Sequence, residues 1–221
     1  MLKVSVVRNI LEINDRIAGQ NRELFSANRV LVLNLMSSPG AGKTTLLERT
    51  VERLKDKYRI GVIEGDITSS YDAERIAQKG VQAVQINTDG ACHLDSNMVR
   101  EALGEFDLGA LDLLVVENVG NLVCPAEFNV GEDMKIMILS VPEGDDKPLK
   151  YPLMFQESRV LIVNKIDLLP YVDFNLKRMR EVTTGLNPTQ VVFEVSCRTG
   201  EGLEAWLNWL EARIKERRAA P

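Results

Sequence analysis

The stretch Ser37-Ser-Pro-Gly-Ala-Gly-Lys-Thr-Thr45 decides the fold class of this 221-residue chain. An apolar run over residues 30–36 precedes it, and a helix-like pattern over residues 46–57 follows it. A buried strand, a glycine-containing loop with Gly-Lys-Thr and a helix together form the layout of a phosphate-binding loop. The usual pattern has glycine at the place of Ser37, so the match is incomplete. The surrounding pattern outweighs that departure, and the alternative is a plain turn between a strand and a helix.

The loop predicts a nucleoside triphosphate as ligand. Its backbone N–H groups, together with the positive end of the following helix, are expected to hold the phosphates. Lys43 can reach the β- and γ-phosphates, and the hydroxyl of Thr44 can ligate Mg²⁺. The residues predicted to bind the nucleotide here are Ser38, Gly40, Ala41, Gly42, Lys43, Thr44 and Thr45.

A second motif, Asn164-Lys-Ile-Asp167, follows a buried-strand pattern and predicts the base. A carboxylate at Asp167 can accept from both N1–H and N2–H₂ of guanine, whereas adenine offers neither donor, so the motif favours guanine. The amide of Asn164 is expected to bond the opposite edge of the base, and the stem of Lys165 is expected to cover the ring. A further base-side loop is expected after the strand pattern at 191–195, although Cys197 within it also fits a purely structural role. The predicted base-side residues are Asn164, Lys165, Asp167, Ser196, Cys197 and Arg198.

Two other strand patterns end in acidic residues, in Glu64-Gly-Asp66 and in Glu117-Asn-Val-Gly120. The carboxyl ends of parallel strands share one edge of a sheet, where open α/β folds bind ligands. Mg²⁺ prefers oxygen ligands, so Asp66 and Glu117 are predicted to hold it with Thr44. Acidic residues also end strands as turn formers, and this simpler interpretation is adopted for Glu64. The backbone N–H of Gly120 is expected to contact the γ-phosphate.

Asp72 has two equally supported interpretations. It either orients the attacking water or begins a helix. The predicted catalytic residues are therefore Lys43, Asp66, Asp72, Glu117 and Gly120.

The order of elements predicts an α/β fold, a mostly parallel sheet with helices on both faces. Residues 1–28 are expected to form an amphipathic helical segment, and residues 29–221 a P-loop GTPase domain. Helices are predicted over residues 71–79 and 94–108, and residues 143–148 are expected to form an exposed loop. Strand-like runs lie near residues 30–36, 60–63, 81–86, 113–116, 135–141, 160–163 and 191–195.

Composition limits the class of partners. The formal charge of −5 argues against a nucleic-acid-binding surface. No apolar run has the length needed to span a membrane, and the first residues lack the pattern of a signal peptide. Three cysteines, an odd number, fit a reducing compartment, so a cytoplasmic location is expected.

The single histidine of the chain stands beside a cysteine, in Cys92-His93, and Cys124 lies in a later loop. Both loops follow predicted parallel strands and are expected at the nucleotide edge of the sheet. Thiolate and imidazole groups suit Zn²⁺, Ni²⁺ or copper better than Mg²⁺. Three ligands are one short of a closed tetrahedral site, which suggests an exchangeable position or completion by a second subunit. The alternative is an ordinary small buried cysteine and a hydrogen-bonded histidine.

These motifs together resemble the HypB family of nickel-inserting GTPases that act in [NiFe]-hydrogenase maturation. The likeness rests on the phosphate loop, Asp66, Cys92-His93-Leu-Asp95, the run from Glu117 to Cys124-Pro125, and Asp167. It implies GTP-dependent homodimerisation, with Cys92, His93 and Cys124 binding Ni²⁺ or Zn²⁺ at the dimer interface. It also implies a hydrogenase large subunit and an accessory nickel chaperone as partners. The adjacent Cys-His favours this family over the related urease nickel GTPases, whose metal loop typically has Cys-Pro-His.

The expected function is therefore a GTP-hydrolysing metallochaperone that uses GTP/GDP, Mg²⁺, and Ni²⁺ or Zn²⁺. One alternative is a GTPase that gates another metalloenzyme, such as urease or a cobalamin-dependent mutase. Another is a nucleotide-switched interaction protein whose Cys/His cluster holds structural zinc.

Overall fold

A computed structural model describes residues 6–67 and 71–220 of the chain. Its centre is a parallel sheet of seven strands in the order β3-β2-β4-β1-β5-β6-β7. The strands are β1 Leu31–Ser37, β2 Ile60–Asp66, β3 Gln82–Asn87, β4 Leu113–Glu117, β5 Met134–Ser140, β6 Val160–Asn164 and β7 Val191–Glu194. All seven correspond to predicted strand runs, and the predicted fold class is confirmed.

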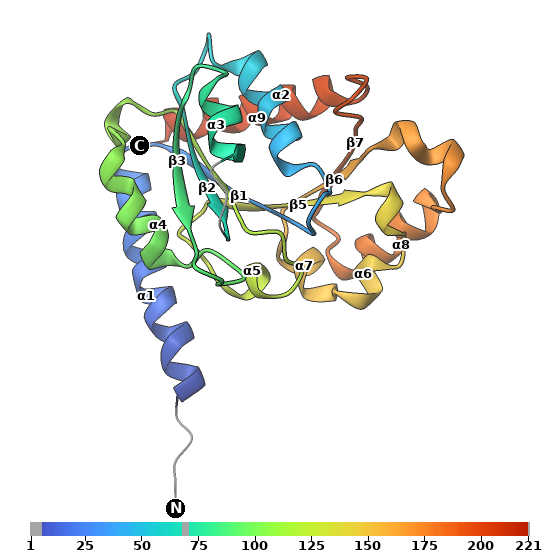
Figure 1. The fold of residues 1–221 in the computed structure, drawn as a ribbon, viewed down its shortest axis with the longest axis horizontal. Helices are drawn as coiled ribbons and strands as arrows, with labels where there is room; N and C mark the ends of the chain where they lie inside the picture. Colours follow the sequence, from blue (N-terminus) through green and yellow to red (C-terminus); the bar gives the residue numbers. More distant parts are fainter. Residues whose placement is uncertain (1–5, 68–70, 221) are drawn as a thin grey trace, which may run out of the picture.

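Helices cover both faces of the sheet (Figure 1). They are α1 Val6–Ala27, α2 Lys43–Leu54, α3 Tyr71–Ala77, α4 Ser96–Ala102, α5 Cys124–Glu127, α6 Lys147–Lys150, α7 Pro152–Glu157, α8 Leu176–Leu186 and α9 Leu203–Ala219. Short 3₁₀ helices are η1 Leu103–Glu105, η2 Leu108–Ala110, η3 Val141–Glu143 and η4 Ile166–Tyr171. Among the described residues, no helix combines the length and the apolar character that a membrane span requires.

Alternation along the strands builds a core on each face, because successive strand side chains point to opposite sides. Leu33 of β1 packs in the cluster beneath α2 and α9, whereas its neighbour Val32 packs in the cluster with Phe25 of α1 and Val99 of α4. A third cluster lies beneath α7 and α8. The parallel sheet is therefore buried on both faces, as its continuous apolar strands require.

Helix α1 is anchored by its C-terminal half. Phe25 is buried in the core, and the amide of Asn21 donates to the carbonyls of Ser96 and Val130 at 2.9 and 3.1 Å. Nearer its start, Ile10 and Ile13 are 55% and 50% exposed. The division of the chain after residue 28 into two parts stays a prediction.

The prediction of one helix over residues 94–108 was wrong. Leu94 is buried ahead of the helix, and the side chain of Asp95 accepts the N–H of Met98, which makes Asp95 the cap of α4. The helix ends at Ala102, and η1 and η2 follow. Capping by a side chain fixes where a helix begins, and the apolar pattern alone did not reveal it.

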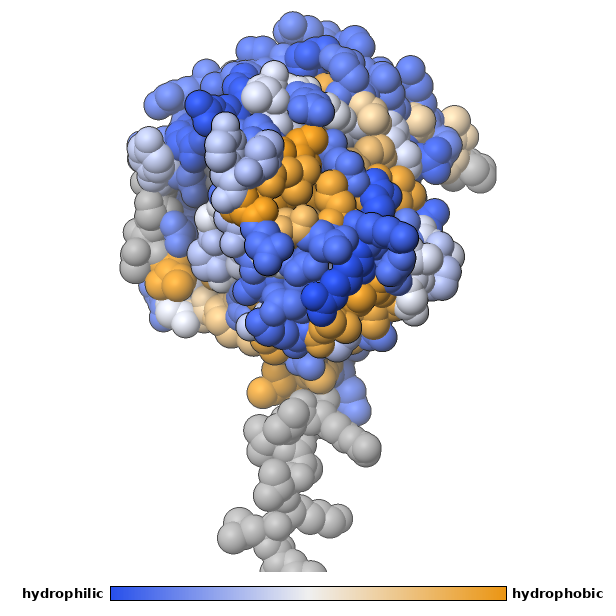
Figure 2. Space-filling view, turned by 90° about the vertical axis from the view of Figure 1, so that its right-hand side faces the viewer, coloured by the Kyte–Doolittle hydropathy of each residue, from blue (hydrophilic) through white to orange (hydrophobic). Residues whose placement is uncertain are grey.

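The two edge strands of the sheet are β3 and β7, with six and four residues. Figure 2 shows apolar side chains gathered on the face of the molecule that is turned to the right in Figure 1, where β7 forms the edge. Val191 and Phe193 of β7 are only partly buried. Short edge strands offer few free backbone groups to another chain.

Candidate functional site

The phosphate loop joins β1 to α2, and its geometry requires glycine at position 42. Gly42 has φ 100°, in the left-handed region, and a Cβ atom there would lie 2.5 Å from the amide nitrogen of Asn164. Helix α2 begins at the next residue, Lys43, so its free N–H groups face the loop. Ser37 is fully buried, and its hydroxyl accepts from the ammonium group of Lys43 at 3.1 Å. The serine in place of the usual glycine therefore holds the lysine.

A cavity of about 540 Å³ lies between this loop and the carboxyl ends of β2 and β4. It brings together every residue predicted to be catalytic, although these come from four separate segments of the chain. Among the residues that line it are Gly40, Gly42, Lys43, Thr44, Thr45, Glu64, Asp66, Asp72, Glu117 and Gly120. Ser38 and Ala41, also predicted to bind nucleotide, belong to the same loop but do not line this cavity.

Two buried carboxylates stand side by side in the cavity. Glu64 and Glu117 are register partners on β2 and β4, with 2% and 4% of their surface exposed. Glu117 Oε1 accepts the hydroxyl of Thr44 at 2.8 Å. Glu64 Oε1 and Glu117 Oε2 have no hydrogen-bond partner among the described residues. Burial raises the pKa of both groups, and the Glu117 carboxylate raises that of Glu64 further.

These unpartnered oxygens fit a divalent cation. Buried charged groups are normally paired or bound to a metal, and a hydroxyl with carboxylates is the ligand set that Mg²⁺ takes beside phosphates. Thr44 and Glu117, both predicted ligands, already contact each other. Glu64 was not among the predicted site residues. Its place directly opposite Glu117 could not be read from the sequence, since strand register depends on the sheet.

The other two predicted carboxylates lie nearer the surface. Asp66 ends β2, and its side chain accepts the N–H of Ile67. Asp72 lies in the first turn of α3, where it pairs with the guanidinium of Arg75 at 2.9 Å. Arg75 also pairs with Glu48 of α2 at 2.6 Å. Asp72 thus lies at a helix start and also lines the cavity. Its role in orienting an attacking water stays a prediction.

A second cavity, of about 410 Å³, adjoins the first on the side of β6 and contains Asn164, Lys165, Asp167, Cys197 and Arg198. The carboxylate of Asp167 accepts the hydroxyl of Ser196 at 2.6 Å, which fixes its orientation. The amide of Asn164 donates to the carbonyl of Ala41 at 2.9 Å, and the ammonium of Lys165 donates to that of Gly40 at 2.6 Å. In this structure Asn164 and Lys165 therefore bind the phosphate loop, and their contact with a base stays a prediction.

The three predicted transition-metal ligands come together from two loops. The sulfur of Cys92 lies 3.1 Å from that of Cys124 and 3.6 Å from Nδ1 of His93. All three ligand atoms lie within 4.8 Å of one another. Burial lowers the pKa of His93, and the hydrogen bond between the Cys124 thiol and the Cys92 sulfur raises the pKa of Cys124. Two sulfurs and one imidazole suit Zn²⁺ or Ni²⁺ and leave one tetrahedral position open.

The imidazole of His93 packs against the ring of Phe128, with ring centroids 3.9 Å apart. Cys197 is buried in the main core and does not belong to the three-residue group. The imidazole and the two thiols are therefore brought together where the two loops meet.

Comparison with known proteins agrees with this geometry. The family described as "CobW/HypB/UreG, nucleotide-binding domain" matches residues 31–194. The hydrogenase maturation factor HypB of Azotobacter vinelandii is 51% identical over 96% of this chain and 69% of its own length. That of Escherichia coli K12 is 47% identical over 96% of this chain and 73% of its own. This chain belongs to the HypB family. A crystal structure of HypB from Helicobacter pylori in complex with nickel superposes with a TM-score of 0.86, at 42% identity over 92% of this chain and 95% of that one.

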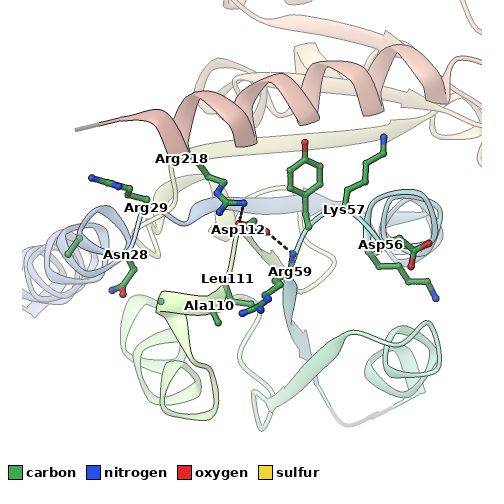
Figure 3. A pocket seen from close by; sticks show the side chains of 13 residues that line it. Asn28, Arg29, Asp56, Lys57, Arg59, Ala110, Leu111, Asp112 and Arg218 are labelled. Carbon is green, nitrogen blue, oxygen red and sulfur yellow. Dashed lines mark hydrogen bonds and ion pairs between the residues drawn. The ribbon is translucent and has the colours of Figure 1, made fainter.

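A larger cavity, of about 820 Å³, lies at the opposite edge of the sheet, where β1, β2 and β4 begin (Figure 3). Its buried carboxylate, Asp112, is fully bonded within the protein. The carboxylate of Asp112 lies between the backbone N–H of Arg59, at 2.8 Å, and the guanidinium of Arg218, at 2.7 Å. Lys57 pairs with Glu211 at 2.8 Å. Helices α1, α2 and α9 end nearby, and their negative ends favour such cations. This HypB-family chain thus has a polar cavity opposite its nucleotide edge, and the buried carboxylate there already has protein partners.

The expectation of an exposed loop over residues 143–148 was wrong. Pro148 is buried, and Glu143 ends η3, where its carboxylate accepts the N–H of Ser140 at 2.7 Å. The same carboxylate also accepts the hydroxyl of Ser38, which ties η3 to the phosphate loop. The pattern Ser140-Val-Pro-Glu143 is a capping box, and this signal could have revealed the ordered turn.

Proposed function

We propose that this chain hydrolyses GTP and couples its nucleotide state to the binding and delivery of nickel during [NiFe]-hydrogenase maturation. The observation that carries the proposal is the closeness of two ligand sets at one edge of the sheet. Cys124 follows the Glu117–Gly120 segment of the nucleotide cavity in the same connection, and its sulfur meets the Cys92 sulfur at 3.1 Å. A change in the nucleotide cavity therefore has a short covalent route to a metal ligand.

In the proposed hydrolysis, Lys43 and the N-terminus of α2 neutralise negative charge on the β- and γ-phosphates. Thr44, Asp66 and Glu117 would hold Mg²⁺, which when bound would stabilise charge on the phosphate oxygens. Asp72 accepts a hydrogen bond from the attacking water and orients it. Asp167, fixed by Ser196, selects guanine.

In the proposed metal cycle, the sensor loop, which we define as residues 118–123, is drawn toward the γ-phosphate through the N–H of Gly120. Loss of the γ-phosphate releases this loop and shifts Cys124, which begins α5 directly after it. The three ligands would then lose their mutual geometry, and the cargo ion would leave. Order-to-disorder changes of this kind accompany γ-phosphate loss in other GTPases.

We further propose a homodimer that forms at this edge when GTP is bound, because a second copy can complete the open metal position. Exposed apolar side chains near the two ligand sets, Ile67 at 45% and Val123 at 53%, would be covered in such a dimer. The proposed partners are an accessory nickel chaperone and the hydrogenase large subunit. We propose no nucleic-acid partner. The proposed location is the cytoplasm.

Light scattering with and without a GTP analogue and Ni²⁺ or Zn²⁺ tests the dimer. The expected result is a dimer with analogue and metal and a monomer with GDP alone, and a monomer in every condition would contradict it. A GTPase assay with GTP and ATP run in parallel tests the enzyme, and equal turnover of the two nucleotides would overturn the guanine assignment. A pull-down against candidate apo-enzymes tests the client, since capture of urease or a cobalamin-dependent mutase in place of the hydrogenase subunit would favour those alternatives.

A further inference from the structure

Asn118 lies at the point where the nucleotide cavity meets the metal ligands. It follows Glu117 at the end of β4 and is 0% exposed. Its backbone N–H donates to the carbonyl of Leu35 on β1 at 2.9 Å, which holds the residue against the strand that leads to the phosphate loop. Asn118 was part of the family-like motif in the sequence, but no function was assigned to it.

The carboxamide of Asn118 bonds three segments at once. Its oxygen accepts the N–H of Leu94 at 2.9 Å and the N–H of Val119 at 3.0 Å. Its nitrogen donates to the side-chain oxygen of Asn34 on β1 at 3.1 Å. Leu94 directly follows Cys92-His93, whereas Val119 belongs to the sensor loop. One oxygen atom is therefore shared by the metal loop, which we define as residues 88–95, and by the sensor loop.

Packing around these bonds leaves little freedom for either loop to move alone. Leu94 is 0% exposed and packs against Gly65, the neighbour of Asp66. On the other side, a Cβ atom on Gly120 would lie 3.0 Å from Pro39 of the phosphate loop. The sensor loop thus lies between the phosphate loop and the metal loop, in contact with both.

We propose that Asn118 is the positioning residue that makes the metal loop follow the sensor loop when the nucleotide changes. This role rests on the nucleotide–metal coupling proposed above. When the Gly120 N–H is drawn toward a γ-phosphate, the neighbouring Val119 moves and its bond to the Asn118 oxygen changes. The same oxygen holds Leu94, and Leu94 carries Cys92 and His93 with it. Loss of a shared acceptor leaves two buried N–H groups without a partner, so the two loops relax independently.

A second contact between the same loops provides an internal comparison. The amide of Asn121 donates to the carbonyl of Cys92 at 3.2 Å, but this bond is exposed to solvent. Water can replace an exposed bond at little cost, whereas the buried bonds of Asn118 have no such substitute. The coupling is therefore assigned to Asn118 and not to Asn121.

The test measures the affinity of Zn²⁺ by competition with a chromogenic chelator, in the GDP state and in the GTP-analogue state. The coupling ratio is the Zn²⁺ affinity in the GTP-analogue state divided by the Zn²⁺ affinity in the GDP state. Typical allosteric couplings are about 5- to 150-fold. We expect a ratio in that range for the parent and a ratio near one for Asn118→Ala. GTP titration without Zn²⁺ checks that each nucleotide state of Asn118→Ala is fully occupied during the measurement.

Asn21→Ala is the matched control. Asn21 is also 0% exposed and also bonds two backbone groups, but it joins α1 to Ser96 and Val130, away from the sensor loop. This variant should keep the parent ratio. If Asn118→Ala has the same coupling ratio as the parent, the role of Asn118 is overturned and the coupling stands. If the parent itself has a coupling ratio of one, the proposed coupling is overturned, and the role of Asn118 with it.

Hydrogen exchange of the parent protein keeps the inference testable if Asn118→Ala does not fold. The amides of Leu94 and Val119 share one acceptor, so their protection should change together between the GDP and GTP-analogue states. A change at Val119 with unchanged protection at Leu94 would contradict the role of Asn118.

Discussion

Two ends of the sheet differ in how their buried charges are satisfied. We call the end where the parallel strands begin the amino edge, and the end where they finish, at the nucleotide cavity, the carboxyl edge. At the amino edge, Asp112 is bonded by the N–H of Arg59 and by Arg218, in the larger cavity of about 820 Å³. At the carboxyl edge, in a cavity of about 540 Å³, Glu64 and Glu117 keep oxygens that no described residue bonds. If volume alone were used to locate the ligand site, the larger cavity at the amino edge would be chosen, away from the phosphate loop. Two unsatisfied carboxylate oxygens in one cavity identify the edge that is built for a ligand, because a protein rarely leaves a pair of such oxygens buried without one.

The largest expected difference between the two edges is the effect on GTP turnover of removing a lysine from each. Lys43→Ala removes the cation beside the phosphates, so GTP turnover should fall at least a hundredfold while the fold remains intact. The measurement is phosphate release under saturating GTP, with circular dichroism to check the fold. Lys55→Ala removes a cation at the amino edge and should leave turnover unchanged. Near-normal hydrolysis in Lys43→Ala would mean that the phosphate loop is misplaced.

Replacement of the metal ligands should affect the carboxyl edge without disturbing nucleotide binding. Cys92→Ala, His93→Ala and Cys124→Ala should each lower Ni²⁺ and Zn²⁺ affinity by at least tenfold, since loss of even an outer partner of a ligand costs that much. Equilibrium dialysis measures the affinities, and GTP titration should give values close to those of the parent. Cys197→Ser, in the buried core, serves as the control for metal affinity. If the triple alanine variant holds metal as tightly as the parent, the metallochaperone mechanism is wrong.

Replacement of Asp167 tests the base-side half of the carboxyl edge. Asp167→Asn removes the carboxylate that accepts two guanine donors, so GTP affinity should fall by about ten- to a hundredfold. Xanthine nucleotides should gain affinity, because their C2 oxygen suits an amide donor. Competition binding with GTP, ATP and XTP gives the three values. If Asp167→Asn keeps the parent's order of nucleotide preference, Asp167 does not select the base, and the base must bind elsewhere.

The smallest expected effect concerns stability without ligands. The folded pKa of Glu64 is raised from 4.5 by burial, so folding favours the protonated carboxyl and the free energy of unfolding should fall as pH rises above about 4.5. Glu64→Gln removes this cost and should raise the free energy of unfolding at pH 7 by about 1 kcal/mol.

Asp112→Asn should do the opposite, because it breaks an ion pair that is already satisfied. Urea unfolding from pH 5 to pH 9, without Mg²⁺ or nucleotide, compares the two variants. Equal destabilisation by both would remove the distinction between the two edges.

Much of the fold could be predicted from the sequence, since buried parallel strands appear as continuous apolar runs and turn residues separate them. The register between strands could not, and with it the meeting of Glu64 and Glu117 remained hidden. Helix α4 was predicted too long because the cap at Asp95 depends on one hydrogen bond, which an apolar pattern does not reveal.

The candidate site was predicted to a similar extent. Motif spacing indicated Lys43, Thr44 and the Cys92-His93 pair, and the structure places them at one edge. The contacts between loops were not predictable, because the shared acceptor on Asn118 and the bond from Asn164 to the phosphate loop join segments far apart in the chain. Local motifs identify chemistry in this protein, whereas the tertiary fold decides which groups act together.

The most direct test of the account is a crystal structure with a GTP analogue, Mg²⁺ and Zn²⁺ bound together. The account predicts the phosphates against Lys43 and the N-terminus of α2, with Mg²⁺ between Thr44 and Glu117. It places Zn²⁺ among Cys92, His93 and Cys124, with the cavity around Asp112 free of nucleotide. Nucleotide density around Asp112, or phosphates away from Lys43, would contradict it.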